Sequence, residues 1–225
     1  MKRVFFIFFL LAGDAFSQNP ALVPALGAMR LGDYPQAIQS LQPIAEKGDT
    51  EAQFLLALAL ESAPDAQRNL PSAHAWYLRA ARAGHAPSQN NAGAMYYDGR
   101  GVARDSAEAM RWYRAAAAQG HAEAQYNLAL MYGQGVATAQ DHREMAQWLQ
   151  KAAAAGVPGA QAQLGVSYQR GIGLTRDLAA AHEWYLKAAE AGYKPAMKEL
   201  AKIYGIGLGV PSDETKARQW SERAQ

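Results

Sequence analysis

Residues 88–120 read SQNNAGAMYYDGRGVARDSAEAMRWYRAAAAQG, and residues 160–192 read AQAQLGVSYQRGIGLTRDLAAAHEWYLKAAEAG. The two stretches are copies of one pattern, because Tyr, Gly, Asp, Trp and Gly recur in them at the same offsets. All five tryptophans of the chain follow the same period of 36 residues, at Trp76, Trp112, Trp148, Trp184 and Trp220. A period of about 20–50 residues indicates one supersecondary unit that is copied and stacked.

Each copy contains two helical segments. In the copy at 124–156, Ala124, Leu128 and Tyr132 are spaced at i, i+4 and i+8, which places them on one face of a first helix, the A helix. A second helix, the B helix, is expected between Asp141 and Gly156. Alanine is abundant and β-branched residues are scarce, which favours helix. The sequence therefore predicts an all-α solenoid of antiparallel helix pairs.

The ends of the predicted helices carry recurring polar and glycine residues. Asp105 and Asp141 are each followed three residues later by Glu, which predicts a reciprocal capping box at the start of the B helix. A glycine pair such as Gly99 and Gly101 predicts a tight turn between the helices. The copy at 124–156 has Ala137 at the second glycine position, so we expect a distorted loop there. The first copy has SAPDAQRN instead, which leaves its loop geometry open. The remaining landmarks in register are Asp177, Asp213, Gly84, Gly120, Gly156 and Gly192.

The amino-terminal residues MKRVFFIFFLLAGDAFSQ are typical of an export signal. Lys2 and Arg3 precede an apolar run, and small residues follow, which predicts a signal peptide over residues 1–17 that is cleaved near Ser17. An uncleaved membrane anchor is the alternative. The chain has no cysteine, and an exported chain without cysteine fits the periplasm. The net charge of +2, without a basic stripe, argues against nucleic acid as a partner.

The composite pattern A-x-x-x-LG-x-x-Y-x-x-G-x-G-V-x-x-D-x-x-x-A-x-x-W-Y-x-x-A-A-x-x-G resembles Sel1-like repeats, a helical-hairpin family related to tetratricopeptide repeats. The resemblance implies a right-handed α/α superhelix that binds protein partners in a concave groove lined mainly by A helices. Residues 18–48 resemble a degenerate tetratricopeptide hairpin and are expected to cap the array. The repeats are expected within residues 49–225, at about 52–84, 88–120, 124–156, 160–192 and 196–225.

Recurring and varying positions have different expected roles. The recurring aromatic residues are expected to form the structural core between repeats: Trp76, Trp112, Trp148, Trp184, Trp220, Tyr96, Tyr132, Tyr168 and Tyr204. The positions of the A helix that vary between copies are expected to bind the partner: Asn90, Asn91, Asp98, Tyr126, Asn127, Leu130, Gln134, Gln163, Arg170, Lys198, Glu199 and Lys202. Their amide and aromatic centre is typical of a protein-binding surface. Phe54, Leu55 and Leu58 are expected to pack under the amino-terminal cap instead.

The sequence predicts a periplasmic protein–protein interaction module and not an enzyme. Family members that neutralise secreted antibacterial effectors suggest an immunity role, with a secreted toxin as the partner. A scaffold of an envelope or secretion complex is the main alternative, and a cell-wall-directed enzyme is the weaker one. The histidines have no metal-ligand spacing and no catalytic motif is present, so we expect no metal, cofactor or catalytic residue. The identity of the partner and the oligomeric state stay open.

Overall fold

The computed structural model describes residues 19–225, so the predicted signal peptide lies outside the described residues. Within this range all regular elements are helices, and the predicted all-α solenoid of 36-residue repeats is confirmed. No helix in residues 19–225 is both long and apolar enough to span a membrane. The elements are η2 (Pro20–Leu22), α2 (Val23–Leu31), α3 (Tyr34–Glu46), α4 (Thr50–Ser62), α5 (Leu70–Arg82), α6 (Ala86–Asp98), α7 (Ser106–Ala118), α8 (Ala122–Gln134), α9 (His142–Ala154), α10 (Pro158–Arg170), α11 (Leu178–Glu190), α12 (Lys194–Ile206) and α13 (Glu214–Arg223).

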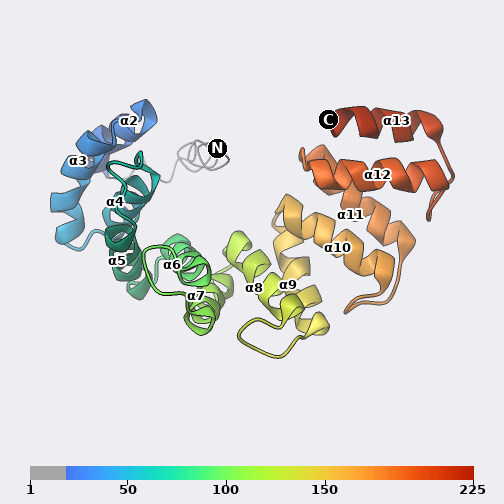
Figure 1. The fold of residues 1–225 in the computed structure, drawn as a ribbon, viewed down its shortest axis with the longest axis horizontal. Helices are drawn as coiled ribbons and strands as arrows, with labels where there is room; N and C mark the ends of the chain where they lie inside the picture. Colours follow the sequence, from blue (N-terminus) through green and yellow to red (C-terminus); the bar gives the residue numbers. More distant parts are fainter. Residues whose placement is uncertain (1–18) are drawn as a thin grey trace. The chain divides into compact units, whose positions relative to one another are not determined.

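The chain forms two compact units, residues 1–115 and residues 116–225, whose boundary falls inside α7. In the described part of the first unit, α2 packs against α3, α3 against α4, α4 against α5, and α5 against α6. In the second unit the same holds from α8 to α13, as Figure 1 shows by colour and label. The even-numbered helices α4, α6, α8, α10 and α12 are the A helices, and the odd-numbered helices from α5 to α13 are the B helices.

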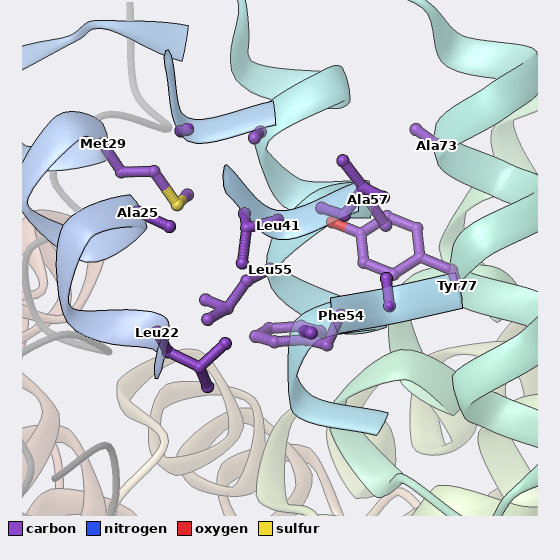
Figure 2. Close-up of a cluster of buried hydrophobic side chains, with 14 of the residues drawn as sticks. Leu22, Ala25, Met29, Leu41, Phe54, Leu55, Ala57, Ala73 and Tyr77 are labelled. Atoms are coloured by element: carbon purple, nitrogen blue, oxygen red, sulfur yellow. The ribbon is translucent and has the colours of Figure 1, made fainter. Parts of the chain in front are cut away.

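The helices α2 and α3 cover the first A helix, α4. Figure 2 shows Leu22 and Met29 directed toward Leu41 of α3 and Leu55 of α4. Leu41 and Leu55 are fully buried, and Phe54 is 3% exposed. Each buried leucine of this kind stabilises the fold by roughly 1.5–3 kcal/mol relative to an exposed one. This contact explains why α4 is apolar at positions that are polar in later repeats.

The aspartate that begins each B helix from α7 to α13 closes its helix pair through its backbone, and Asn69 takes its place before α5. The N–H of Asp105 donates to the carbonyl oxygen of Tyr96 at 3.0 Å, and the N–H of Asp177 donates to Tyr168 at 2.9 Å. The Asp105 carboxylate caps the helix by accepting from the N–H of Glu108 at 3.0 Å. The predicted reciprocal capping box is wrong in its second half. The Asp105 N–H is already engaged, and the Glu108 side chain binds Arg111 instead.

The loops after the A helices α6, α8, α10 and α12 share a left-handed glycine at the helix end despite sequence changes. The predicted distortion at Ala137 is wrong, because Ala137 adopts φ 62°, close to the φ of 72° at Gly173 in the next repeat. The second glycine is also a point of close approach, since a Cβ at Gly173 would collide with the carbonyl oxygen of His142. In the SAPDAQRN loop, α4 ends at Ser62 and the next residue, Ala63, has φ −56° and ψ 151°. The Arg68 side chain donates to the Ala63 carbonyl at 3.2 Å.

A buried glutamine links each of the first four A helices to the end of the preceding helix. The Gln89 side-chain amide donates to the Ala81 carbonyl at 3.1 Å, and the Gln161 amide donates to the Ala153 carbonyl at 3.2 Å. The same contact recurs at Gln53 and Gln125. These glutamines follow the 36-residue period, so the sequence itself carries their signal. The last repeat has the apolar Met197 at this position.

The tryptophans lie on the B helices at the edge of the core. Trp112 and Trp220 are buried, whereas Trp76, Trp148 and Trp184 are partly exposed. A cationic side chain covers each indole ring, for example Lys151 at 3.9 Å from the Trp148 centroid. The aliphatic part of such a side chain shields the ring while its charge remains in water. The cations over the other rings are Arg79, Arg111, Lys187 and Arg223.

Candidate functional site

A pocket of about 240 Å³ opens among the A helices of residues 116–225. Most of its walls come from α10 and α12, and α8 contributes Tyr126. The pocket is smaller than the roughly 300–1,000 Å³ of ordinary small-molecule sites, so its size suits one side chain of a larger partner. Its lining consists of Tyr126, Gly159, Ala162, Gln163, Val166, Gln169, Arg170, Tyr185, Tyr193, Pro195, Ala196 and Glu199.

Tyr185 reaches the pocket from the B helix α11. Its ring passes Gly165 so closely that a Cβ there would lie 3.0 Å from the ring, which explains why this repeat needs glycine at that position. The hydroxyl of Tyr185 donates to the Gln169 side-chain oxygen at 2.7 Å. Burial, together with the negative charge of Glu199, raises the pKa of Tyr185 to about 12, against the opposing charge of Arg170. Tyr185 therefore stays protonated and acts as a fixed donor.

Tyr126 of α8 covers the opposite part of the pocket. Its ring lies over Gly159, where a Cβ would be 3.1 Å from the ring and hydroxyl atoms. Burial raises the pKa of Tyr126, so its hydroxyl is neutral at physiological pH. An aromatic ring with a polar tip is the side-chain type that most often anchors protein interfaces.

The charges on this surface are mostly positive. Arg170 at the end of α10 and Lys198 and Lys202 on α12 are exposed, and Glu199 is the one carboxylate among them. Lys202 binds Glu199 at 2.7 Å. Arg176, in the loop after α10, donates to the Gln169 carbonyl at 3.1 Å and adds a further positive charge nearby.

In the first unit, the chain's own charged side chains occupy the position that corresponds to this pocket. The hydroxyl of Tyr77, on the B helix α5, donates to Glu61 of α4 at 3.0 Å. The guanidinium of Arg100 binds Glu61 and also binds Asp98 at 3.1 Å. The Glu61 side chain is only 14% exposed, so the ion pair with Arg100 compensates for its burial. Burial, more than the Glu61 charge, raises the pKa of Tyr77 well above its ordinary value.

The structure brings together some of the residues expected to bind a partner and separates others. Tyr126, Gln163, Arg170 and Glu199 line one pocket. Lys198 and Lys202 extend the same surface along α12. Three other expected residues lie on α8 outside the pocket lining, namely Asn127, Leu130 and Gln134. Three lie in the first unit, namely Asn90, Asn91 and Asp98.

Sequence reasoning missed Gln169, Tyr185 and Tyr193 as lining residues. Tyr185 follows the tryptophan of its repeat on the B helix, whereas the residues expected to bind a partner all lie on A helices. A signal was available, since Tyr77, Tyr113 and Tyr185 alternate with Leu149 and Ser221 at this position. A position that varies between large polar and small or apolar residues is less typical of a pure core contact.

Histidine and carboxylate side chains in residues 19–225 are not clustered as the ligands of a metal ion would be. No group of three or more His, Asp or Glu side chains in this range could hold a metal ion. What the pocket offers is hydrogen-bond donors, aromatic surface and one unpaired guanidinium. This combination is suited to recognition.

Comparisons with known proteins agree with the repeat architecture. The family model described as Sel1 repeat matches residues 50–85, 86–121, 122–157, 158–193 and 194–224. A Sel1 repeat protein from Oxalobacter formigenes is 31% identical with a TM-score of 0.83, and the match covers 92% of this chain and 82% of that chain. No curated protein is significantly similar in sequence.

Two further solved structures are similar over most of this chain. A protective antigen of uropathogenic Escherichia coli strains, described as having an SLR fold, is 35% identical with a TM-score of 0.79. The match covers 83% of this chain but only 40% of the antigen. An immunity protein from Pseudomonas aeruginosa is 24% identical with a TM-score of 0.53, over 79% of this chain and 64% of that chain. At that identity the likeness concerns the fold alone.

Proposed function

This chain belongs to the Sel1-repeat family, whose members mediate protein–protein interactions, and we propose that it binds a protein partner through the A-helix face of residues 116–225. We define this face by Tyr126, Gln163, Arg170, Lys198, Glu199 and Lys202. The observation that carries the proposal is the pocket in which Tyr126, Gln163, Arg170 and Glu199 meet. These residues differ from their counterparts in the other repeats, as expected for side chains selected by a partner and not by stacking.

The composition of the face also supports a protein as its ligand. Tyr126 and Tyr185 have few rotatable bonds and have already lost much of their freedom through packing, so little further entropy is lost on binding. Gln163 and Gln169 provide amide donors and acceptors that match a peptide backbone. The pocket is smaller than most small-molecule sites, and a protruding side chain of a partner fits its volume.

The proposal is tested with purified chain and extracts of the organism that encodes it. A double variant, Tyr126→Ala with Gln163→Ala, should fail to retain the partner that the wild-type chain retains. The matched control is Gln147→Ala with Gln150→Ala, because both glutamines are exposed on the B helix α9 of the same unit. Equal retention by both double variants would contradict binding through the A-helix face.

Within this function, we propose a periplasmic immunity role as the narrower hypothesis. The amino-terminal residues Met1–Gln18, with Lys2, Arg3 and an apolar run, support export. An immunity protein should form one tight complex with a secreted effector and restore growth of cells poisoned by that effector. A large stable assembly in native extracts, without such rescue, would favour a scaffold and contradict the immunity role.

A further inference from the structure

We propose that the pocket among α8, α10 and α12 receives a carboxylate side chain, Asp or Glu, of the partner, with Arg170 as the cation that binds it. This inference rests on the proposed function and specifies the chemistry of the bound segment. The support comes from comparing the surroundings of Tyr185 with those of Tyr77, its counterpart in the first unit.

The first unit shows how the chain fills the equivalent position by itself. Tyr77 and Tyr185 occupy the same place in repeats that lie three periods apart, and so do Glu61 and Gln169. In the first unit, Arg100 from the loop after α6 binds Glu61, whose other carboxylate oxygen accepts from Tyr77. The cation and the anions are therefore both supplied internally, and no partner is needed to neutralise them.

The second unit lacks both members of this ion pair, and the position opens into the pocket. Gln169 replaces the carboxylate of Glu61, and Leu208 replaces Arg100. Arg170 adds a guanidinium where the first unit has Ser62. Among residues 19–225 the Arg170 guanidinium has no carboxylate within ion-pair distance. Glu199, at the register of Asn91, is a carboxylate in this lining, but it pairs with Lys202, so the charge left without a counter-ion is that of Arg170.

The neighbouring groups favour an anionic guest over a cationic one. Lys202 already holds Glu199 at 2.7 Å, which reduces the attraction that this carboxylate has for a second cation. A basic guest would also lie near Arg170 and Lys198, and like charges brought together disfavour binding.

The pocket has hydrogen-bond donors for a carboxylate. The Gln169 oxygen accepts from Tyr185, which leaves the Gln169 amide as a donor. Gln163 offers a second amide, and the neutral Tyr126 offers a hydroxyl. An ionised carboxylate accepts several hydrogen bonds, and those from a guanidinium are among the strongest in proteins. The volume of about 240 Å³ suits one acidic side chain with its flanking backbone.

The test uses two peptide probes and the full chain labelled with nitrogen-15. The probes are acetyl-Gly-Ser-Asp-Ser-Gly-amide and the same peptide with Asn in place of Asp. Titration with the Asp peptide should shift the Arg170 Nε–Hε resonance and the side-chain amides of Gln163 and Gln169 in a saturable way. The Asn peptide should bind at least about tenfold more weakly, as expected when one charge-assisted bond is lost.

Three variants determine whether the effect belongs to this pocket. Arg170→Gln should lower the affinity for the Asp peptide about tenfold or more. Arg143→Gln, which removes one exposed positive charge from α9, should leave binding unchanged. Glu199→Gln should tighten binding, because it removes the competing carboxylate. Equal binding of the two peptides, no effect of Arg170→Gln, or no saturable shift would each overturn the proposal.

A separate measurement distinguishes failure of this inference from failure of the proposed function. A photo-crosslinking amino acid at Lys198, outside the pocket but on the A-helix face, reports whether a partner binds there at all. If a partner crosslinks at Lys198 but the Asp peptide does not bind, only the carboxylate proposal is overturned. Crosslinking confined to B-helix positions would overturn the proposed function as well.

Discussion

Ala137 has a backbone φ of 62° at a place where the neighbouring repeats have glycine. A left-handed conformation costs an L-residue roughly 1–2 kcal/mol, because its Cβ approaches the following carbonyl oxygen. The conformation persists at Ala137 because the turn is held by hydrogen bonds on both sides. The Val136 N–H donates to Met131 at 3.0 Å, and the Asp141 N–H donates to Tyr132 at 3.0 Å. Stacking of the helix pair thus overrides a local preference.

The strain at Ala137 predicts that Ala137→Gly stabilises the protein. We expect a gain of about 0.5–1 kcal/mol in the free energy of unfolding, since relief of strain exceeds the entropy that glycine adds to the unfolded chain. Urea denaturation followed by circular dichroism measures this. Ala75→Gly, in the exposed interior of α5, should lose about 1 kcal/mol. Gly173→Ala should lose about 2 kcal/mol or more, from strain and collision with His142. A loss for Ala137→Gly would contradict the strain at this turn.

His74 predicts a dependence of stability on pH. It is 7% exposed and its Nε2 has no hydrogen-bond partner in the described part of the chain. Burial lowers the pKa of His74 from 6.5, and burial also lowers the pKa of His182. The unfolded chain therefore binds more protons below about pH 6.5, so the free energy of unfolding should fall as the pH decreases through that window.

The His74 effect is measured by urea unfolding at about pH 5 and pH 8. His74→Met introduces the residue that the next repeat has at the same place, Met110, and should reduce the difference between the two pH values. His182→Met should reduce it further. An unchanged pH dependence in the double variant would show that other groups cause it.

Buried glutamines connect the elements of successive repeats. Each side-chain amide crosses from the start of an A helix to a carbonyl at the end of the preceding helix, as Gln89 does to Ala81 at 3.1 Å. Gln89 is 6% exposed and Gln125 is 7% exposed, so both amides are removed from water. Buried polar groups of this kind require a partner, which is why the position is specified so consistently in the first four repeats.

The glutamine contact predicts a moderate loss of stability in Gln89→Met. Methionine has a similar size and occurs naturally at position 197 of the last repeat, so packing should be kept. The hydrogen bond to Ala81 is lost, while the Ala81 carbonyl still accepts from the Gly84 N–H at 3.0 Å, and we expect a loss of about 1 kcal/mol. Gln150→Met, exposed on α9, should stay within about 0.5 kcal/mol of wild type. Equal effects of the two substitutions would contradict the role of the buried amide.

The elements were more predictable from the sequence than the contacts between them. The 36-residue period and the positions of Asp105 and Gly120 predict the helix pairs, because capping and left-handed turns depend on local chemistry. The loop at Ala137 could not be predicted in this way, since hydrogen bonds across the helix pair hold its conformation. Tyr185 could not be predicted as a lining residue for a similar reason. Its ring lies in the core, while its hydroxyl reaches Gln169 at the pocket.

Across the full chain, two units repeat one architecture and differ in the polarity of their A-helix residues. In residues 19–115 the apolar side of α4 is covered by α2 and α3, and Arg100 neutralises Glu61. In residues 116–225 the A helices leave a pocket with an unpaired cation among the described residues, Arg170. We propose that the tryptophans and glycines serve the stacking of repeats, and that the positions that differ between repeats serve recognition.

Site-specific photo-crosslinking in living cells shows directly whether a protein partner binds the A-helix face of residues 116–225. A photoreactive amino acid at Gln163 faces the pocket, and one at Gln147 lies exposed on the B helix α9 of the same unit. Binding at the A-helix face predicts one discrete adduct from position 163 and none from position 147. The same adduct from both positions, or an adduct from position 147 alone, would contradict binding at this face.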